Sequence, residues 1–121
     1  MKIVSTTDLD KIPSIHNPEV NKHEILHAGD VPHIDKVGQV IFAPGQIIPI
    51  HTHADIHEIF FIRSGNGVIR CNGEERHVRE GTCIVVDPNE AHEVENTGSD
   101  TMLLIYIKMD AVSSGNRLNA S

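Results

Sequence analysis

The chain has 121 residues, enough for one domain (1–121) with a buried core. Its formal net charge of −7 and the lack of a basic cluster disfavour nucleic acid and anionic membranes as partners. Aromatic residues make up only 3% of the chain, so Ile, Val and Leu must build the core, as in many strands. Because no apolar run is long enough to span a membrane and the first residues lack a signal-peptide pattern, we expect a cytoplasmic protein.

The first 33 residues are predicted to form an irregular N-terminal arm. Pro13, Pro18 and Pro32 interrupt this segment, and only residues 22–28 could form a short strand. We expect the arm to pack outside a barrel or on a partner subunit.

Residues 34–109 show many short strand-like segments separated by turns, and no segment has helical periodicity. Asn72-Gly73 is a strong hairpin signal, and Pro49 is acceptable in a strand at a sheet edge or a bulge. The pattern predicts an all-β, double-sheet jelly-roll barrel, followed by a polar, mobile tail over residues 110–121. The predicted strands cover residues 37–43, 47–53, 57–63, 68–71, 74–79, 82–86, 91–96 and 101–109.

Cys71 and Cys83 fall within two of these predicted strands. Two cysteines are too few for a disulfide framework, so we expect both to be reduced and half-buried. A redox pair would require their two strands to be adjacent in the fold.

Two histidines one residue apart are the most informative feature of the chain. Side chains two residues apart point to the same face of a strand, so His51 and His53 can aim both imidazoles into one cavity. Glu58 and the more distant His92 supply a carboxylate and a third imidazole. Such a mixed nitrogen and oxygen set suits one divalent metal ion, which could be Fe, Mn, Ni, Co, Zn or Cu.

The spacing of these residues resembles that of the cupins. Gly45, His51, His53, Glu58 and Gly65 fit the pattern G-x5-H-x-H-x4-E-x6-G, which is similar to the first cupin motif at every fixed position. The second cupin motif is matched over residues 81–96 by a glycine, the metal-ligand histidine and an asparagine: Gly81, His92 and Asn96. There Asp87 stands in the proline position, and Asn89, which can adopt a positive φ, stands in the second glycine position. The resemblance extends over roughly residues 22–109. It implies a cupin double-stranded β-helix, a homodimer, and metal ligation by His51, His53, Glu58 and His92.

The remaining polar and aromatic residues are interpreted by strand alternation. Alternation places His57 on the opposite face of the strand from Glu58, so it is not expected to be a metal ligand. A supporting or subunit-interface role for His57 is left open. Phe60 and Ile62 share the face of Glu58 and could line the pocket or pack in the core. The sequence does not predict which face of its strand Tyr106 lies on, because residues 101–109 are apolar on both faces. Five histidines without partner spacing are predicted to face solvent: His16, His23, His27, His33 and His77.

Two functions are compatible with this pattern. The first is a small metal-dependent enzyme acting on a small organic molecule, either dioxygenase-like or an isomerase, lyase or cyclase, in which Glu58 is the one acid or base identified. The second is a non-catalytic module that binds or senses a small ligand. Turnover distinguishes the two, since a binding module takes up its ligand without forming a product.

Overall fold

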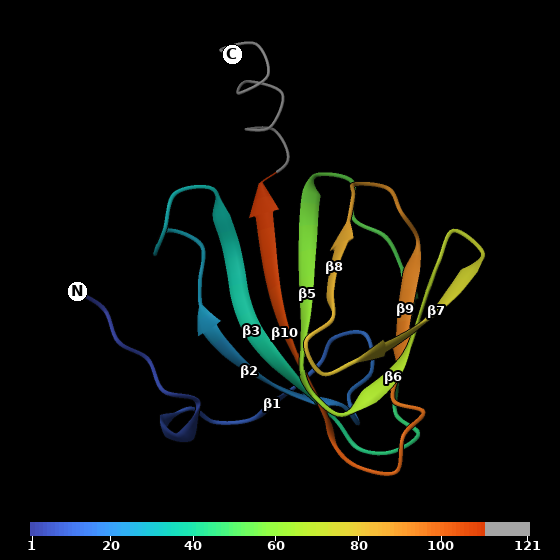
Figure 1. Cartoon of the computed structure of the whole chain (residues 1–121). Coiled ribbons are helices and arrows are strands. Elements are labelled where there is room, and N and C mark those ends of the chain that lie inside the picture. The colour runs from blue at the N-terminus through green and yellow to red at the C-terminus, as the bar shows by residue number, and fades with distance from the viewer. Residues whose placement is uncertain (111–121) are drawn as a thin grey trace.

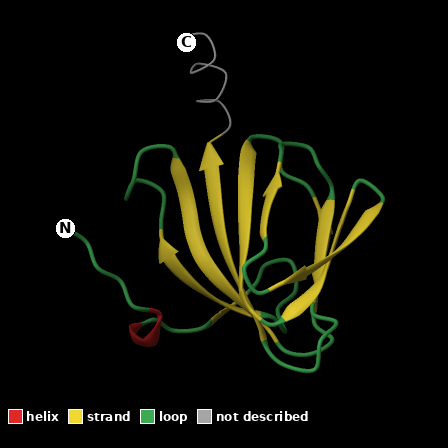
Figure 2. Ribbon diagram, in the orientation of Figure 1, coloured by secondary structure: helices red, strands yellow, loops and turns green. Residues whose placement is uncertain are grey.

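The computed structural model describes residues 1–110, so the tail predicted over 110–121 lies almost wholly outside the described residues. Within residues 1–110 the chain forms one 3-10 turn, η1 (Thr6–Asp8), and ten strands (Figures 1 and 2). The strands are β1 (Ile12–Pro13), β2 (Asn21–Leu26), β3 (Ile34–Phe42), β4 (Ile47–His51), β5 (Ile56–Ser64), β6 (Asn66–Cys71), β7 (Glu74–Arg79), β8 (Cys83–Val86), β9 (His92–Glu95) and β10 (Met102–Asp110).

The strands form two antiparallel sheets that face each other across the core. The larger sheet has six strands in the order β1-β2-β3-β10-β5-β8, and the smaller has four in the order β4-β9-β6-β7. Figure 1 shows the chain crossing between the sheets, so that β10, the last strand, lies between β3 and β5. The predicted all-β, double-stranded β-helix is therefore confirmed, because strands distant in sequence pair with each other in both sheets.

Local sequence signals set the turns and the irregular positions. Asn72 and Gly73 have φ values of 52° and 78°, the left-handed conformation that a tight hairpin between β6 and β7 requires. Asn89, in the position of a family glycine, also has a positive φ of 68°. Pro49 lies in β4, an edge strand, where the pairing with β9 is irregular between Ile48 and His51.

The N-terminal segment is more ordered than its prolines suggest. It contributes two strands, β1 and β2, and β2 pairs with β3 along most of its length. The segment thereby extends the large sheet, and alternation directs Lys22 and Glu24 from β2 toward the space between the sheets, where both line a pocket.

Apolar side chains fill the space between the sheets and extend to the wall of this pocket. Phe42, Ile62, Met102 and Leu104 are at most 2% exposed, so inward residues of β3, β5 and β10 form the centre of the core. Asn96 is also fully buried, and its side-chain amide donates to the carbonyl of Phe42 at 3.0 Å. That hydrogen bond satisfies a polar group that would otherwise destabilise the core.

The outer face of the large sheet is also apolar. Cross-strand pairing aligns Ile105 with Phe61, and Ile59 with Val85. Phe61 is 41% exposed and Val85 is 61% exposed, although both are large apolar side chains. Strands β10, β5 and β8 thus present a continuous apolar surface, which we call the outer apolar face.

The two cysteines are free. Cys71 in β6 is half-buried as predicted, whereas Cys83 in β8 is exposed, because it lies on the outer apolar face. Strands β6 and β8 belong to different sheets, so they are not adjacent and the condition for a redox pair is not met. Among the described residues, no helix has the length and apolar character needed to cross a membrane.

Candidate metal centre

Both sheets contribute to a cluster of three histidines and one glutamate. His51 ends β4 and lies directly opposite His92, the first residue of β9, in the antiparallel pairing of the small sheet. Glu58 comes from β5 of the large sheet, and His53 from the loop that joins β4 to β5. Each residue offers one ligand atom, and these atoms all lie within 4.8 Å of one another. The four predicted ligands therefore come together and could hold a metal ion.

The carboxylate of Glu58 is the centre of this cluster. Its Oε1 lies 3.3 Å from Nε2 of His92 and 3.7 Å from Nε2 of His53. The rings of His51 and His92 lie 4.4 Å apart between centroids. Glu58 and His92 are buried, at 4% and 1% exposure, whereas the other two rings are half-buried. One side of the cluster is thus closed by protein and the other meets a pocket.

Backbone carbonyls orient two of the rings. The carbonyl of Pro49 lies 2.9 Å from Nδ1 of His51, and that of Glu90 lies 2.9 Å from Nδ1 of His92. A carbonyl can only accept a hydrogen bond, so each Nδ1 carries the proton and donates it. The tautomer that results leaves Nε2 with a free lone pair, which is the arrangement metal-ligating histidines need.

The unpaired atoms of the cluster fit a cation. Nε2 of His53, Oε1 of Glu58 and Nε2 of His92 are all buried without a hydrogen-bond partner. Buried polar atoms are rarely left unpaired, because each costs roughly 1–3 kcal/mol of desolvation. A divalent cation bound between them would satisfy all three. Three imidazole nitrogens with one carboxylate oxygen suit the borderline transition metals, and no single metal is preferred by this set.

In the cluster without a metal, the pKa is lowered for His51 and His53 and raised for His92. Burial lowers the pKa of His51 to about 4, and nearby imidazoles add to this effect. Burial also lowers the pKa of His53, although Glu58 opposes the change. Burial acts in the same direction on His92, but the contact with Glu58 outweighs it and raises the pKa of His92. Burial alone raises the pKa of Glu58, yet His92 and other nearby cationic groups lower it overall.

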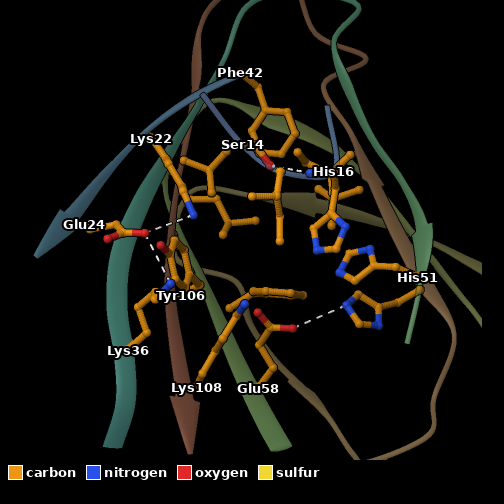
Figure 3. Close-up of a pocket in the computed structure, with 17 residues that line it drawn as sticks. Ser14, His16, Lys22, Glu24, Lys36, Phe42, His51, Glu58, Tyr106 and Lys108 are labelled. Carbon is orange, nitrogen blue, oxygen red and sulfur yellow. Dashed lines mark hydrogen bonds and ion pairs between the residues drawn. The ribbon is translucent and has the colours of Figure 1, made fainter. Parts of the chain in front are cut away.

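A pocket of about 140 Å³ opens beside the cluster between the two sheets (Figure 3). Phe60 and Tyr106 line it, which places Tyr106 on the inner face, whereas Ile62 packs wholly in the core. His57 lies on the opposite face from Glu58, as alternation predicts, and its Nδ1 is 3.2 Å from Oδ1 of Asp87. His57 is therefore not a ligand candidate.

Two of the five histidines predicted to face solvent do not. His16 stacks on His51, with ring centroids 3.9 Å apart and an interplanar angle of 19°, and it lines the pocket. His23 is 7% exposed on the outer side of β2. Both predictions were wrong because they rest on sequence spacing, whereas the N-terminal segment reaches its neighbours only through the tertiary fold. The exposed positions of His27, His33 and His77 are confirmed.

Several charged residues of the pocket were missed by sequence reasoning. Lys22, Glu24, Lys36 and Lys108 line it together with Tyr106, so Glu58 is not its one candidate acid or base. Strand alternation offered a signal for some of them. Lys22 and Glu24 are two apart, as are Tyr106 and Lys108, but without the pairing of β2, β3 and β10 nothing indicated which face looks inward.

Comparison with known proteins defines the class to which this fold and site belong. Residues 38–108 match the sequence model of the Cupin domain. The chain is 36% identical over 64 residues to an oxalate-binding protein of Thermotoga maritima, covering 53% of each, so it spans about half the length of that relative. It is 30% identical over 101 residues to an uncharacterised protein of Methanocaldococcus jannaschii, covering 82% of this chain and 80% of that protein. The chain belongs to the cupin family.

Solved structures show the same fold. A predicted oxalate decarboxylase from Thermotoga maritima superimposes with a TM-score of 0.83 at 22% identity, covering 90% of this chain and 99% of that one. A polyketide cyclase from Streptomyces resistomycificus superimposes with a TM-score of 0.77 at 19% identity, covering 90% and 79%. At these identities the likeness extends to the architecture alone.

Replacing His51 and His53 together with alanine should abolish metal binding, because two of the three imidazoles are lost. Elemental analysis of the purified protein after loading with Zn²⁺ measures the outcome. His57→Ala is the matched control, since its ring lies on the opposite face of β5, and it should keep one metal ion per chain. Unchanged stoichiometry in the double variant would exclude this site.

Metal affinity should fall as the pH drops through the raised pKa of His92. Below that pKa the metal-free protein holds a proton on His92 that the cation must displace, so affinity falls about tenfold per pH unit. His51, with its pKa of about 4, adds a second proton only in stronger acid. Competition with a chromophoric chelator between about pH 8 and about pH 5 measures this slope. Circular dichroism should show the fold intact, because the Ile, Val and Leu core does not include the ligands. A constant affinity across this range would contradict the assignment of His92.

Proposed function

We propose that the protein is a divalent-metal cupin that acts on a small organic molecule as a metalloenzyme. The observation that carries the proposal is the set of buried, unpaired ligand atoms of His53, Glu58 and His92. Glu58 and His92 also line a pocket. A purely packing role does not account for polar atoms that are buried without a partner. The metal would be one of Fe, Mn, Ni, Zn, Co or Cu, one ion per chain.

The pocket supports a small ligand. Its volume of about 140 Å³ is close to that of an apolar cavity which holds benzene, so a ligand of roughly six to ten non-hydrogen atoms fits. When bound, a divalent metal supplies Lewis acidity and, for redox-active ions, electron transfer. The chain's own residues would orient the ligand, and Glu58 would accept or return a proton at its carboxylate.

The reaction type is proposed at the level of a class. A dioxygenase-like reaction, or an isomerase, lyase or cyclase reaction, is compatible with a metal site that has four protein ligands and opens on a pocket. A relative named as an oxalate-binding protein and a structural neighbour described as a polyketide cyclase both support a small organic ligand.

The second candidate is a non-catalytic module that binds a small ligand. A relative known as an oxalate-binding protein, 36% identical over 64 residues, favours it. The same pocket and metal would serve this role, with the ligand held and not converted. The two proposals differ in product formation and not in the site.

Mass spectrometry under native and denaturing conditions should reveal one divalent metal ion per chain and any co-purified small molecule. Incubation of that molecule with the metal-loaded protein should give a product for an enzyme, and saturable binding without product for a module. The variant carrying both His51→Ala and His53→Ala is the control and should do neither. Full activity or binding in that variant would contradict both proposals.

We also propose that the protein is a homodimer in the cytoplasm. Two free cysteines are compatible with a reducing compartment. The outer apolar face supports the dimer, since Phe61 and Val85 leave apolar area in solvent that a second copy would cover.

Light scattering at micromolar concentration should give about twice the chain mass of 13.3 kDa. Phe61→Glu places a charge in the outer apolar face and should shift the mass toward the monomer. His77→Glu, at an exposed position on β7 of the other sheet, is the control and should leave the mass unchanged. A monomeric unsubstituted protein would refute the dimer.

A further inference from the structure

The pocket beside the metal centre is electropositive, although the protein is acidic. Lys22, Lys36 and Lys108 line it with two carboxylates, Glu24 and Glu58, an excess of one positive charge before any metal cation is counted. The whole chain carries a formal net charge of −7. Cations gathered in one concave site on an acidic protein favour an anionic ligand.

Two of the three lysines already have a partner. Nζ of Lys22 and Nζ of Lys36 lie 3.3 Å and 3.2 Å from the same oxygen, Oε1 of Glu24 (Figure 3). One carboxylate oxygen is thus shared by two ammonium groups in ion pairs. This cluster forms the pocket wall contributed by β2 and β3.

Lys108 is different, because within residues 1–110 its ammonium forms no hydrogen bond or ion pair. Its Nζ lies 5.7 Å from the centroid of the Tyr106 ring. In β10, Lys108 stands in register between Lys36 on β3 and Glu58 on β5. Burial lowers the pKa of Lys108, while the charge of Glu58 opposes this. Lys108 therefore places a donor group without an acceptor between the lysine pair and the metal ligands.

Tyr106 adds a second donor without a partner. Tyr106 is 4% exposed, and its hydroxyl is buried with no hydrogen-bond partner. The ring lies over Gly38 of β3 so closely that a Cβ at that position would collide with the ring and its hydroxyl. Glycine at position 38 thus makes room for this orientation of the ring. A buried hydroxyl held in one place without a partner costs stability that a bound acceptor would recover.

We infer that the ammonium of Lys108 and the hydroxyl of Tyr106 form a carboxylate-binding subsite, so that the ligand of the metal centre is a small organic acid. The inference rests on the proposed function and names its substrate class. The carboxylate would accept hydrogen bonds from both groups, and the rest of the ligand would extend toward Glu58 and the histidines. Apolar walls that include Phe60 and Leu104 fit an organic body better than an inorganic ion.

With a metal bound, Glu58 would not be available as the partner of Lys108. No ion pair joins the two side chains, although they stand side by side in register. A cation at the cluster would take up the negative charge of Glu58 and leave the ammonium beside a second positive centre. Two positive centres that share a partly buried pocket repel each other, and an incoming anion relieves that repulsion.

The chain carries its own reporter for this subsite. Tyr106 is the single tyrosine and the sequence contains no tryptophan, so tyrosine emission arises from this pocket alone. The experiment titrates the full-length, Zn²⁺-loaded protein with malonate, oxalate, neutral malonamide and inorganic phosphate. Malonate or oxalate should change the emission in a saturable way, whereas malonamide should not. Phosphate should bind more weakly, because the apolar walls do not suit an inorganic ion, and binding as tight as that of malonate would indicate a general anion site.

Lys108→Met should weaken binding of the dicarboxylate by about tenfold or more, because a charge-assisted hydrogen bond is lost, while the Zn²⁺ content stays at one per chain. Lys108→Arg keeps the charge and should retain part of the affinity. Tyr106→Phe, followed by calorimetry, should give a smaller loss. Lys11→Met removes an exposed lysine in the N-terminal segment and serves as the matched control with unchanged affinity.

The outcomes separate this inference from the proposed function. A protein that binds no Zn²⁺ contradicts the metal centre. A protein that binds Zn²⁺ normally but takes up malonamide as tightly as malonate overturns the carboxylate subsite. Unchanged dicarboxylate affinity in both Lys108→Met and Tyr106→Phe also overturns it, and leaves only direct binding to the metal. If Lys108→Met does not fold, the comparison of Lys108→Arg with Tyr106→Phe decides, since unchanged affinity in both variants likewise overturns the subsite.

Discussion

The buried carboxylate of Glu58 is the constraint on which the metal-ligand cluster and its pocket depend. A lone carboxylate at 4% exposure is costly, so cationic or donor groups must surround it. His92 and His53 provide them at 3.3 Å and 3.7 Å, but neither contact is a hydrogen bond. The arrangement is therefore incomplete as a purely protein structure. A divalent cation completes it, because it satisfies the imidazole lone pairs and the carboxylate at once.

The fold separates this polar cluster from the core that stabilises it. Inward residues of β3, β5 and β10 change along each strand from apolar to charged, as from Leu104 through Tyr106 to Lys108. The apolar ends pack into one core that also forms part of the pocket wall, and the charged ends complete that wall. Because the core is built mainly at one end of these strands, the other end can hold unpaired polar groups without loss of the barrel.

The N-terminal segment links the pocket to the rest of the molecule. Strand β2 adds Lys22 and Glu24 to the wall, and the loop before it places His16 against His51. The segment therefore helps decide which ligands fit, although it lies outside the two motifs that define the family. Proteins that share the cupin barrel can differ in ligand through such additions, since function resides in the site and not in the fold.

Local sequence was sufficient for the features that depend on neighbouring residues. Asn72-Gly73 marked its hairpin, and the motif spacing that resembles the cupins indicated the cluster of His51, His53, Glu58 and His92 that forms. Alternation within a strand predicted that His51 and His53 share a cavity, although His53 lies in the loop after β4. The hairpin follows from turn conformation, which acts over a few residues, whereas the ligand set was indicated by the resemblance to the family motifs. The sequence alone therefore determined the all-β class and the four ligand candidates.

Tertiary structure decided the rest of the site. Residues 101–109 are apolar on both faces, so only the pairing of β10 between β3 and β5 shows that Tyr106 and Lys108 look inward. His16 reaches His51 across 35 positions of sequence, a contact for which no local pattern exists. The space for the Tyr106 ring comes from Gly38 on another strand. Such contacts depend on register between distant strands, and register is fixed by the packing of the whole sheet.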